Sequence, residues 1–86
     1  MQSQHYLSEL RPGQQATVQA ILSRHEIKRR LEDLGLTAGC KVTCVFSAYS
    51  KDPIAYRVRG TLLALRKKDA RNILIAEGGI ANEESS

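Results

Sequence analysis

The sequence predicts a mainly β protein: a small, mostly antiparallel five-stranded β-barrel with one short α-helix after the first strand. Two observations predict this fold class. Short runs of alternating apolar and polar residues recur, with turn residues between them, at the roughly eight- to twelve-residue spacing typical of small barrels. A single stretch, residues 24–34, instead spaces its apolar residues as a helix does. With 86 residues, the chain has length for one domain.

The first strand is predicted over residues 15–22 (QATVQAIL). It follows Arg11-Pro12-Gly13, which predicts a type II turn, because proline presets φ at the second position and Gly13 supplies the positive φ of the third. Apolar and polar residues alternate along the strand, as expected for a half-buried strand. Its buried face would hold Ala16, Val18, Ala20 and Leu22.

The helix is predicted over residues 24–34. Ser23 and Glu26 have the spacing of a capping box, and Leu22 and Ile27 have the spacing of a hydrophobic staple. Gly35 would end the helix, because glycine takes the left-handed conformation at little cost. The apolar stripe of the helix would consist of Ile27, Leu31 and Leu34.

Four more strands are predicted over residues 40–47, 54–58, 62–66 and 72–76. Gly39 would form the turn before the first of them, Gly60 a hairpin turn between the second and third, and residues 67–70 a short turn before the last. A closed barrel of these strands would leave no free strand edge. The buried faces would hold Cys40, Val42, Cys44, Phe46, Ile54, Tyr56, Val58, Leu63 and Leu65.

The chain is basic, with 13 Lys and Arg against 9 Asp and Glu, or a net charge of +4. Two of the acids, Glu83 and Glu84, lie in the polar segment 81–86, so the rest of the chain has 13 against 7, or +6. This balance favours an acidic partner such as nucleic acid, an anionic membrane surface or an acidic protein face. It is equally typical of a solvated surface that keeps a small domain soluble.

The sequence contains no run of 18 apolar residues that could span a membrane. Its first residues, MQSQHYLSEL, lack the basic and apolar regions of a signal peptide. Two cysteines without a secretion signal predict reduced thiols and a cytoplasmic location.

The two cysteines do not have the spacing of a metal site. On a strand, Cys40 and Cys44 would lie roughly 13 Å apart, whereas two thiolates on one zinc lie about 4 Å apart. Only His5 and His25 could complete such a set. We therefore expect no metal and no cofactor, with Cys44 in the core and Cys40 at the rim of the barrel.

Nothing in the sequence predicts catalysis. The segment GLTAG (35–39) lacks the Lys-Ser/Thr of a phosphate-binding loop and follows a helix instead of opening one. Neither histidine has a nucleophile in an evident motif, and no paired carboxylates are apparent. We expect a protein that is not an enzyme.

Three segments carry a resemblance to a known family: LSELRPGQQATV (7–18), RRLEDLGLTAGCKVTCV (29–45) and KDPIAYRVRGTLLALRKKDARNILI (51–75). Their order is more specific than any one motif, since a Leu-Gly-Leu turn is followed by an Asp-Pro-Ile loop and then by Leu-Arg-Lys-Lys-Asp-Ala. In this combination the chain resembles the FeoA family of small cytosolic proteins of bacterial ferrous iron transport. The resemblance covers residues 7–77 and leaves 1–6 and 78–86 as tails.

The resemblance implies an SH3-like β-barrel that carries a short helix. It also implies an accessory role beside FeoB, a membrane transporter with a cytosolic G-protein domain. The expected function is therefore a non-catalytic binding module that docks on the cytosolic part of FeoB and modulates uptake, with no small-molecule substrate. The family offers no established catalytic or metal residues to transfer to this chain.

We expect partner contacts in the loop 48–53, in the 35–39 turn and on neighbouring basic residues. The residues expected to make them are Tyr49, Lys51, Asp52, Arg57, Arg59 and Arg66. The residues expected to shape turns are Gly13, Gly35, Gly39 and Gly60.

Two alternative functions stay open. A nucleic-acid-binding barrel would rest on net charge alone, because the sequence lacks clear aromatic stacking platforms. A ferrous-ion chaperone would have to use His5, His25 and the cysteines. A homo-oligomer is compatible with either function or with the transporter-binding module.

Overall fold

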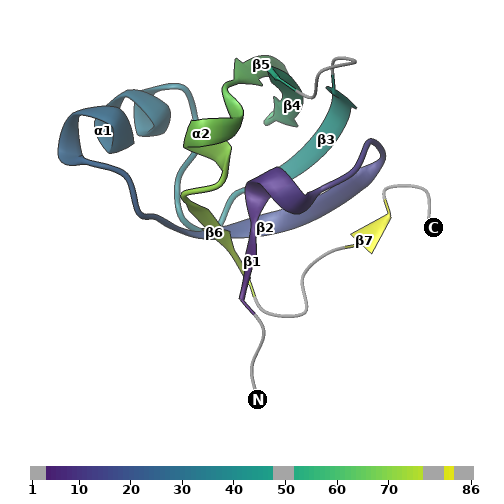
Figure 1. The fold of residues 1–86 in the computed structure, drawn as a ribbon, viewed down its shortest axis with the longest axis horizontal. Helices are drawn as coiled ribbons and strands as arrows, with labels where there is room; N and C mark the ends of the chain where they lie inside the picture. Colours follow the sequence, from purple (N-terminus) through teal and green to yellow (C-terminus); the bar gives the residue numbers. More distant parts are fainter. Residues whose placement is uncertain (1–3, 48–51, 77–80, 83–86) are drawn as a thin grey trace.

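The computed structural model describes residues 4–47, 52–76 and 81–82. Strands dominate these ranges, and the principal helix follows the first long strand, as predicted (Figure 1). In chain order the elements are β1 (His5–Tyr6), the 3₁₀ helix η1 (Leu7–Glu9), β2 (Gln14–Ile21), α1 (His25–Asp33), β3 (Lys41–Ser47), β4 (Ile54–Val58), β5 (Thr61–Leu65), α2 (Lys67–Ala70), β6 (Ile73–Ile75) and β7 (Ala81–Asn82).

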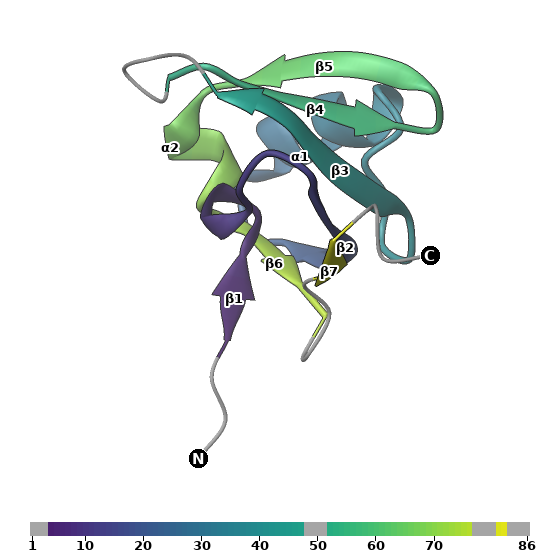
Figure 2. The same cartoon turned by 90° about the vertical axis from the view of Figure 1, so that its right-hand side faces the viewer.

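The strands form one antiparallel sheet in the order β1-β6-β2-β3-β4-β5, and β7 adds to β2. The five predicted strands are β2 to β6, and β1 and β7 add two residues each. β2 bends between two partners, since its first half pairs with β3 and its second half with β6. This bend curls the sheet into a barrel, with β3, β4 and β5 side by side at one end of it (Figure 2).

The barrel is open at one seam, which corrects the expectation of a closed one. β1 and β5 stand at the two ends of the hydrogen-bonded path, and the described residues contain no ladder between them. β1 pairs with β6 over its two residues, and the chain then turns into η1. Within the described part of the chain, β5 therefore keeps a free edge.

Two short strands lie where the sequence predicts tails. His5 and Tyr6 pair with Ile75 and Leu74 of β6, so this part of the predicted N-terminal tail is a strand. The Glu9 carboxylate fixes the segment, because it accepts the Tyr6 N–H at 2.8 Å and lies 2.9 Å from His5 Nδ1. The hydrogen bond from His5 lowers the pKa of Glu9 from its ordinary value.

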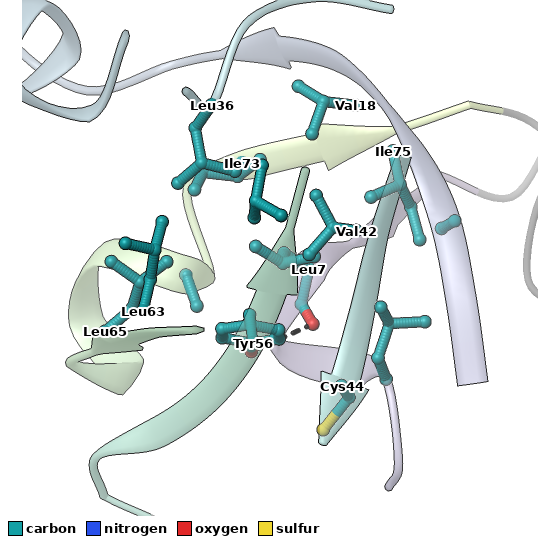
Figure 3. Packing of buried hydrophobic residues seen from close by; sticks show 14 of the residues in the cluster. Leu7, Val18, Leu36, Val42, Cys44, Tyr56, Leu63, Leu65, Ile73 and Ile75 are labelled. Atoms are coloured by element: carbon teal, nitrogen blue, oxygen red, sulfur yellow. Dashed lines mark hydrogen bonds between the residues drawn. The ribbon is translucent and has the colours of Figure 1, made fainter. Parts of the chain in front are cut away.

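The core is a continuous cluster of Leu, Ile, Val, Ala, Cys and Tyr side chains inside the curled sheet (Figure 3). Tyr56 lies fully buried, as predicted, and its hydroxyl donates a 3.2 Å hydrogen bond to the Leu7 carbonyl oxygen. Burial raises the pKa of Tyr56 well above its ordinary value, with a smaller effect from Cys44. This bond ties η1 to β4 across the barrel.

The helix ends at Gly35 through a Schellman motif. The Leu36 N–H donates to the Leu31 carbonyl oxygen and the Gly35 N–H to the Glu32 carbonyl oxygen, both at 3.0 Å. Gly35 has φ of +106°, which a residue with a Cβ adopts only under strain. Leu31 and Leu36, the pair that usually makes the hydrophobic contact of this motif, are both buried. The predicted helix stop is confirmed.

The other predicted glycine turns are also present. Gln14 N–H donates to the Arg11 carbonyl oxygen at 2.9 Å, which closes the turn at Pro12 and Gly13. Positive φ occurs at Gly13, Gly39 and Gly60 as well as at Gly35. Arg59 shares positive φ with Gly60, and this pair forms the two-residue turn between β4 and β5.

Register shifts overturn two predicted strand faces. In β2, a shift between Val18 and Ala20 turns Ile21 into the core and leaves Leu22 57% exposed. In β3, a shift between Cys44 and Phe46 leaves Phe46 60% exposed instead of buried. An extra residue on one strand reverses the alternation beyond it, so a strict period of two places these side chains on the wrong face.

The predicted start of the helix is wrong. Arg24, not Ser23, is the N-cap, and no side chain caps the helix there. The Ser23 hydroxyl is buried without a hydrogen-bond partner. Since Leu22 points to solvent, the predicted staple between Leu22 and Ile27 lacks its first member.

Candidate partner-binding surface

The free edge of β5 has a definite pattern of backbone groups. The two-residue turn pairs Val58 with Thr61, and in such hairpins this first pair exchanges both hydrogen bonds. Hydrogen-bonded and non-bonded pairs then alternate along the ladder. The N–H and C=O of Leu62 and Ala64 therefore point away from β4, toward the side where β5 has no strand partner among the described residues.

A groove of about 590 Å³ lies between α1 and the β5–α2 segment. Figure 1 shows α1 on one side of β5 and α2, with β3 on the other side. The apolar residues of the groove are Ile27, Leu31, Leu34, Ala64 and Leu65. Its charged residues are Arg30, Arg66, Lys68 and Asp69, so three cations oppose one carboxylate. The groove is thus lined by apolar residues and by a predominantly basic set of charged residues.

The outer face of the β3–β5 sheet adds exposed apolar side chains, Leu62 on the edge strand β5 and Phe46 two strands away on β3. Phe46 and Leu62 are 60% and 62% exposed. Phe46 pairs with Ala55, and Ala55 pairs with Ala64 of β5, so these three residues form one row across the sheet. Exposed apolar side chains that gather on one face are typical of interaction sites.

The structure separates the residues predicted from charge. Arg66 is exposed and lines the groove. Arg57 lies half-buried on β4, opposite Leu62 of β5. Arg59 lies at the hairpin turn, where its Nη2 donates to Thr37 Oγ1 at 3.3 Å.

The other predicted contacts, Tyr49, Lys51 and Asp52, precede β4 in the sequence. The Asp52 carboxylate accepts the Lys67 backbone N–H at 3.0 Å, so it supports the start of α2. Tyr49 and Lys51 lie outside the described residues. Of the predicted set, Arg66 alone is a groove residue within the described part of the chain.

Most groove residues are missing from the sequence-based set, although signals for some of them exist. Leu34 falls on the predicted apolar stripe of the helix but is 46% exposed, because it faces the groove and not the core. Lys68 and Asp69 belong to a segment predicted only as a turn, which forms α2. The groove depends on how α1 packs beside β5, and this distant relation has no signature in local periodicity.

The metal and chaperone hypotheses gain no support from the described residues. Among them, no group of three or more His, Cys, Asp or Glu side chains could hold a metal ion. Cys40 and Cys44 are both buried, and neither forms a disulfide. Cys40 therefore belongs to the core, and not to the rim as expected. Burial raises the pKa of the Cys44 thiol, which disfavours the thiolate that binds metal.

The described residues also contain no helix that could span a membrane. The two α-helices have nine and four residues, and nothing helical in the described part of the chain has the length and apolarity of a bilayer span.

These observations define the class of the protein, a small SH3-like β-barrel domain with one short helix. A model of the FeoA domain matches residues 5–77. The chain therefore belongs to the FeoA family, a family of accessory proteins of ferrous iron transport.

A curated relative links this domain to a transporter in one polypeptide. The chain is 34% identical over 67 residues to the Fe(2+) transport protein A/Fe(2+) transporter FeoB fusion protein of Porphyromonas gingivalis. The matched region is 78% of this chain but 8% of that protein. The chain thus corresponds to a small part of the fusion protein.

Two solved structures resemble the chain closely. The solution structure of FeoA from Chlorobium tepidum is 36% identical, with a TM-score of 0.80 over 85% of this chain and 70% of that chain. The crystal structure of Stenotrophomonas maltophilia FeoA complexed with zinc, described as an SH3 domain protein, is 28% identical. Its TM-score is 0.82 over 92% of this chain and 98% of that chain. The predicted SH3-like fold is confirmed.

Proposed function

We propose that the chain is a cytoplasmic accessory protein that binds the cytosolic part of a FeoB-like transporter and modulates ferrous iron uptake without catalysing a reaction. The observation that carries this proposal is the P. gingivalis fusion, in which a segment similar to this chain is joined to FeoB. The S. maltophilia protein, also similar to this chain, is described as a candidate activating factor of ferrous iron transport.

Covalent fusion supports an interaction between the separate chains. Two domains on one polypeptide are held at a high effective concentration, in the millimolar range for short linkers, so even a weak contact forms. Complementary surfaces that meet in a fused protein can also bind each other when the two domains are separate chains. The basic groove, the free β5 edge and the exposed apolar row give this chain a surface of that kind.

The site residues expected from the sequence enter this proposal unequally. Arg66 lines the groove, and Arg57 lies across the ladder from Leu62 near the free edge. We place the main contact at the groove and β5 edge. Asp52 acts on the partner indirectly, by supporting α2. Tyr49 and Lys51, which lie outside the described residues, stay in the proposed contact as the sequence predicts.

A pull-down at physiological salt tests the proposal. The cytosolic domain of the FeoB transporter from the same organism is immobilised, and the purified chain is passed over it. A second column carries an unrelated protein of similar negative charge, to control for attraction by net charge. We expect retention on the first column only. No retention on it, or equal retention on both, would refute specific binding.

A cellular measurement tests the modulation. Uptake of radioactive ferrous iron is compared in cells with and without the gene, at matched FeoB levels. We expect the rate to change when the chain is absent and to recover when it is restored. An unchanged rate would contradict a role in uptake, even if the two proteins bind.

A further inference from the structure

We propose that β5 binds an extended acidic segment of its partner as an additional strand, which lies in the groove between β5 and α1. This inference rests on the proposed function for the identity of the partner, the cytosolic part of the transporter. It goes further in naming the backbone groups that recognise the segment and the chemistry of that segment.

The β5 edge is unprotected. Its sequence, TLLAL, contains no proline and no lysine, and its five residues pair with β4 without a register shift. Natural proteins usually protect exposed edges with such residues, with bulges or with very short strands. The opposite end of the sheet follows that rule, because β1 has two residues. β5 therefore presents the outward N–H and C=O groups of Leu62 and Ala64 as an unprotected template for pairing.

The groove beside this edge has room for an added strand. A strand added to β5 would run along the edge with α1 on its other side, where Leu34 and Ile27 offer apolar contacts. Side chains of an extended segment alternate between two faces. Those of one face would meet the apolar residues of the groove, and those of the other would lie near the exposed Leu62. Strand addition of this kind takes affinity from main-chain hydrogen bonds and specificity from such alternating contacts.

The charges around β5 favour an acidic segment as the occupant of the groove. Arg30, Arg66 and Lys68 line the groove against the single carboxylate of Asp69. Arg59 lies at the other end of β5. A segment with acidic side chains would meet a complementary surface at both ends of the strand.

The same charges disfavour a second copy of the chain as the occupant. An antiparallel pair of two β5 strands would bring the Arg59 end of one copy against the Arg66 and Lys67 end of the other. Like charges that face each other across strands are destabilising. The edge is therefore better matched to a partner of opposite charge than to itself.

Amide hydrogen exchange on the isotope-labelled chain, with and without the unlabelled cytosolic FeoB domain, measures the pairing directly. We expect the Leu62 and Ala64 amides to exchange at least about tenfold more slowly in the complex, because they gain hydrogen-bond acceptors. The Leu63 amide already faces β4 and is the internal control. Binding without protection of Leu62 and Ala64 would overturn strand addition while the proposed function stands.

A matched pair of charge reversals tests the groove. Arg29 and Arg30 are adjacent, exposed residues of α1, but only Arg30 lines the groove. Both substitutions, Arg30→Glu and Arg29→Glu, change net charge equally. We expect Arg30→Glu to weaken binding of the cytosolic domain by about tenfold or more and Arg29→Glu by less than about twofold. Equal weakening would show attraction by net charge and would overturn the proposed site.

Ala64→Pro tests the edge with little change of side-chain size. Proline lacks the N–H, but at position 64 this group faces away from β4, so the β4–β5 ladder keeps its hydrogen bonds. We expect a variant with near-native circular dichroism that binds the cytosolic domain about tenfold more weakly. A folded Ala64→Pro variant with unchanged affinity would refute the proposal.

Two remaining outcomes are also decisive. If the wild-type chain does not bind the cytosolic domain at all, the proposed function fails and this inference fails with it. If the Leu62 and Ala64 amides of the free chain become protected as its concentration rises, a second copy occupies the edge, and the acidic partner is overturned.

Discussion

Replacing Gly35 with alanine isolates the cost of the backbone conformation at the end of α1. A Cβ built at Gly35 would lie 3.7 Å from Val58 Cγ1 and 3.8 Å from Arg59 Cδ, which are ordinary contacts. The substitution therefore has no steric cost. What remains is φ of +106°, which alanine adopts only with strain. Left-handed conformations cost a non-glycine residue about 1–2 kcal/mol, so we expect the free energy of unfolding to fall by that amount.

Urea unfolding followed by circular dichroism measures this loss, and the melting temperature should fall by roughly 5–15 °C. Gly35→Asn is the informative comparison, because asparagine tolerates positive φ better than alanine although it is larger. If backbone strain dominates, the asparagine variant is more stable than the alanine variant. An alanine variant as stable as wild type, or an asparagine variant less stable than the alanine one, would refute the reasoning.

Three further predictions concern single side chains, all measured by urea unfolding. Burial holds the pKa of Tyr56 in the folded chain above the ordinary value of 10, so above about pH 10 Tyr56 should lower stability by about 1.4 kcal/mol per pH unit, because only the unfolded state releases its proton. The Cys44 thiol, whose pKa is also raised by burial, adds a separate fall that begins near the ordinary thiol pKa. Tyr56→Phe should lack only the Tyr56 part of the slope. Leu31→Ala should lower the free energy of unfolding by about 2–5 kcal/mol, because Leu31 is buried. Leu34→Ala should lower it by less than about 1 kcal/mol, because Leu34 is exposed to the groove. Equal losses for the two variants would contradict this placement. Asp52→Ala should lower the free energy of unfolding by about 1 kcal/mol. Asp52→Asn should lower it by less, since asparagine keeps an acceptor for the Lys67 N–H. A larger loss for the asparagine variant would count against that hydrogen bond.

The sequence predicts the fold best where local and distant effects agree. β4 shows this, since Ile54, Tyr56 and Val58 alternate in the sequence and are all buried. The β4–β5 turn follows from Gly60, because a two-residue turn needs positive φ and glycine accepts it. Such features depend on neighbours within a few residues, so one sequence is enough to predict them.

The failures occur where distant contacts override the local pattern. Leu22 and Phe46 fit the alternation of their strands, yet both are exposed, because β2 and β3 each contain a register shift. The shift in β2 lies where the strand changes partner from β3 to β6. The position of this shift depends on the curvature of the whole barrel, which the local alternation of apolar and polar residues does not predict.

The candidate site was harder to predict than the fold for a related reason. Charge identified Arg66, but the groove also requires α1 to lie beside β5, and this depends on the turn that Gly35 begins. In the closed barrel predicted from the sequence, β5 would have no free edge. The open seam becomes apparent only from the strand pairing, since β1 pairs with β6 and no ladder between described residues joins β1 to β5.

The open seam and the basic charge have a joint consequence. An unprotected apolar edge is a hazard for a free chain, because copies can pair through it. Here the cations at the two ends of β5 oppose such pairing by repulsion, and a net charge of +4 opposes association in general. The same cations would attract an acidic segment. One set of residues can thus keep the edge open in the free chain and select the partner that covers it, so an edge without proline or lysine need not lead to association of copies.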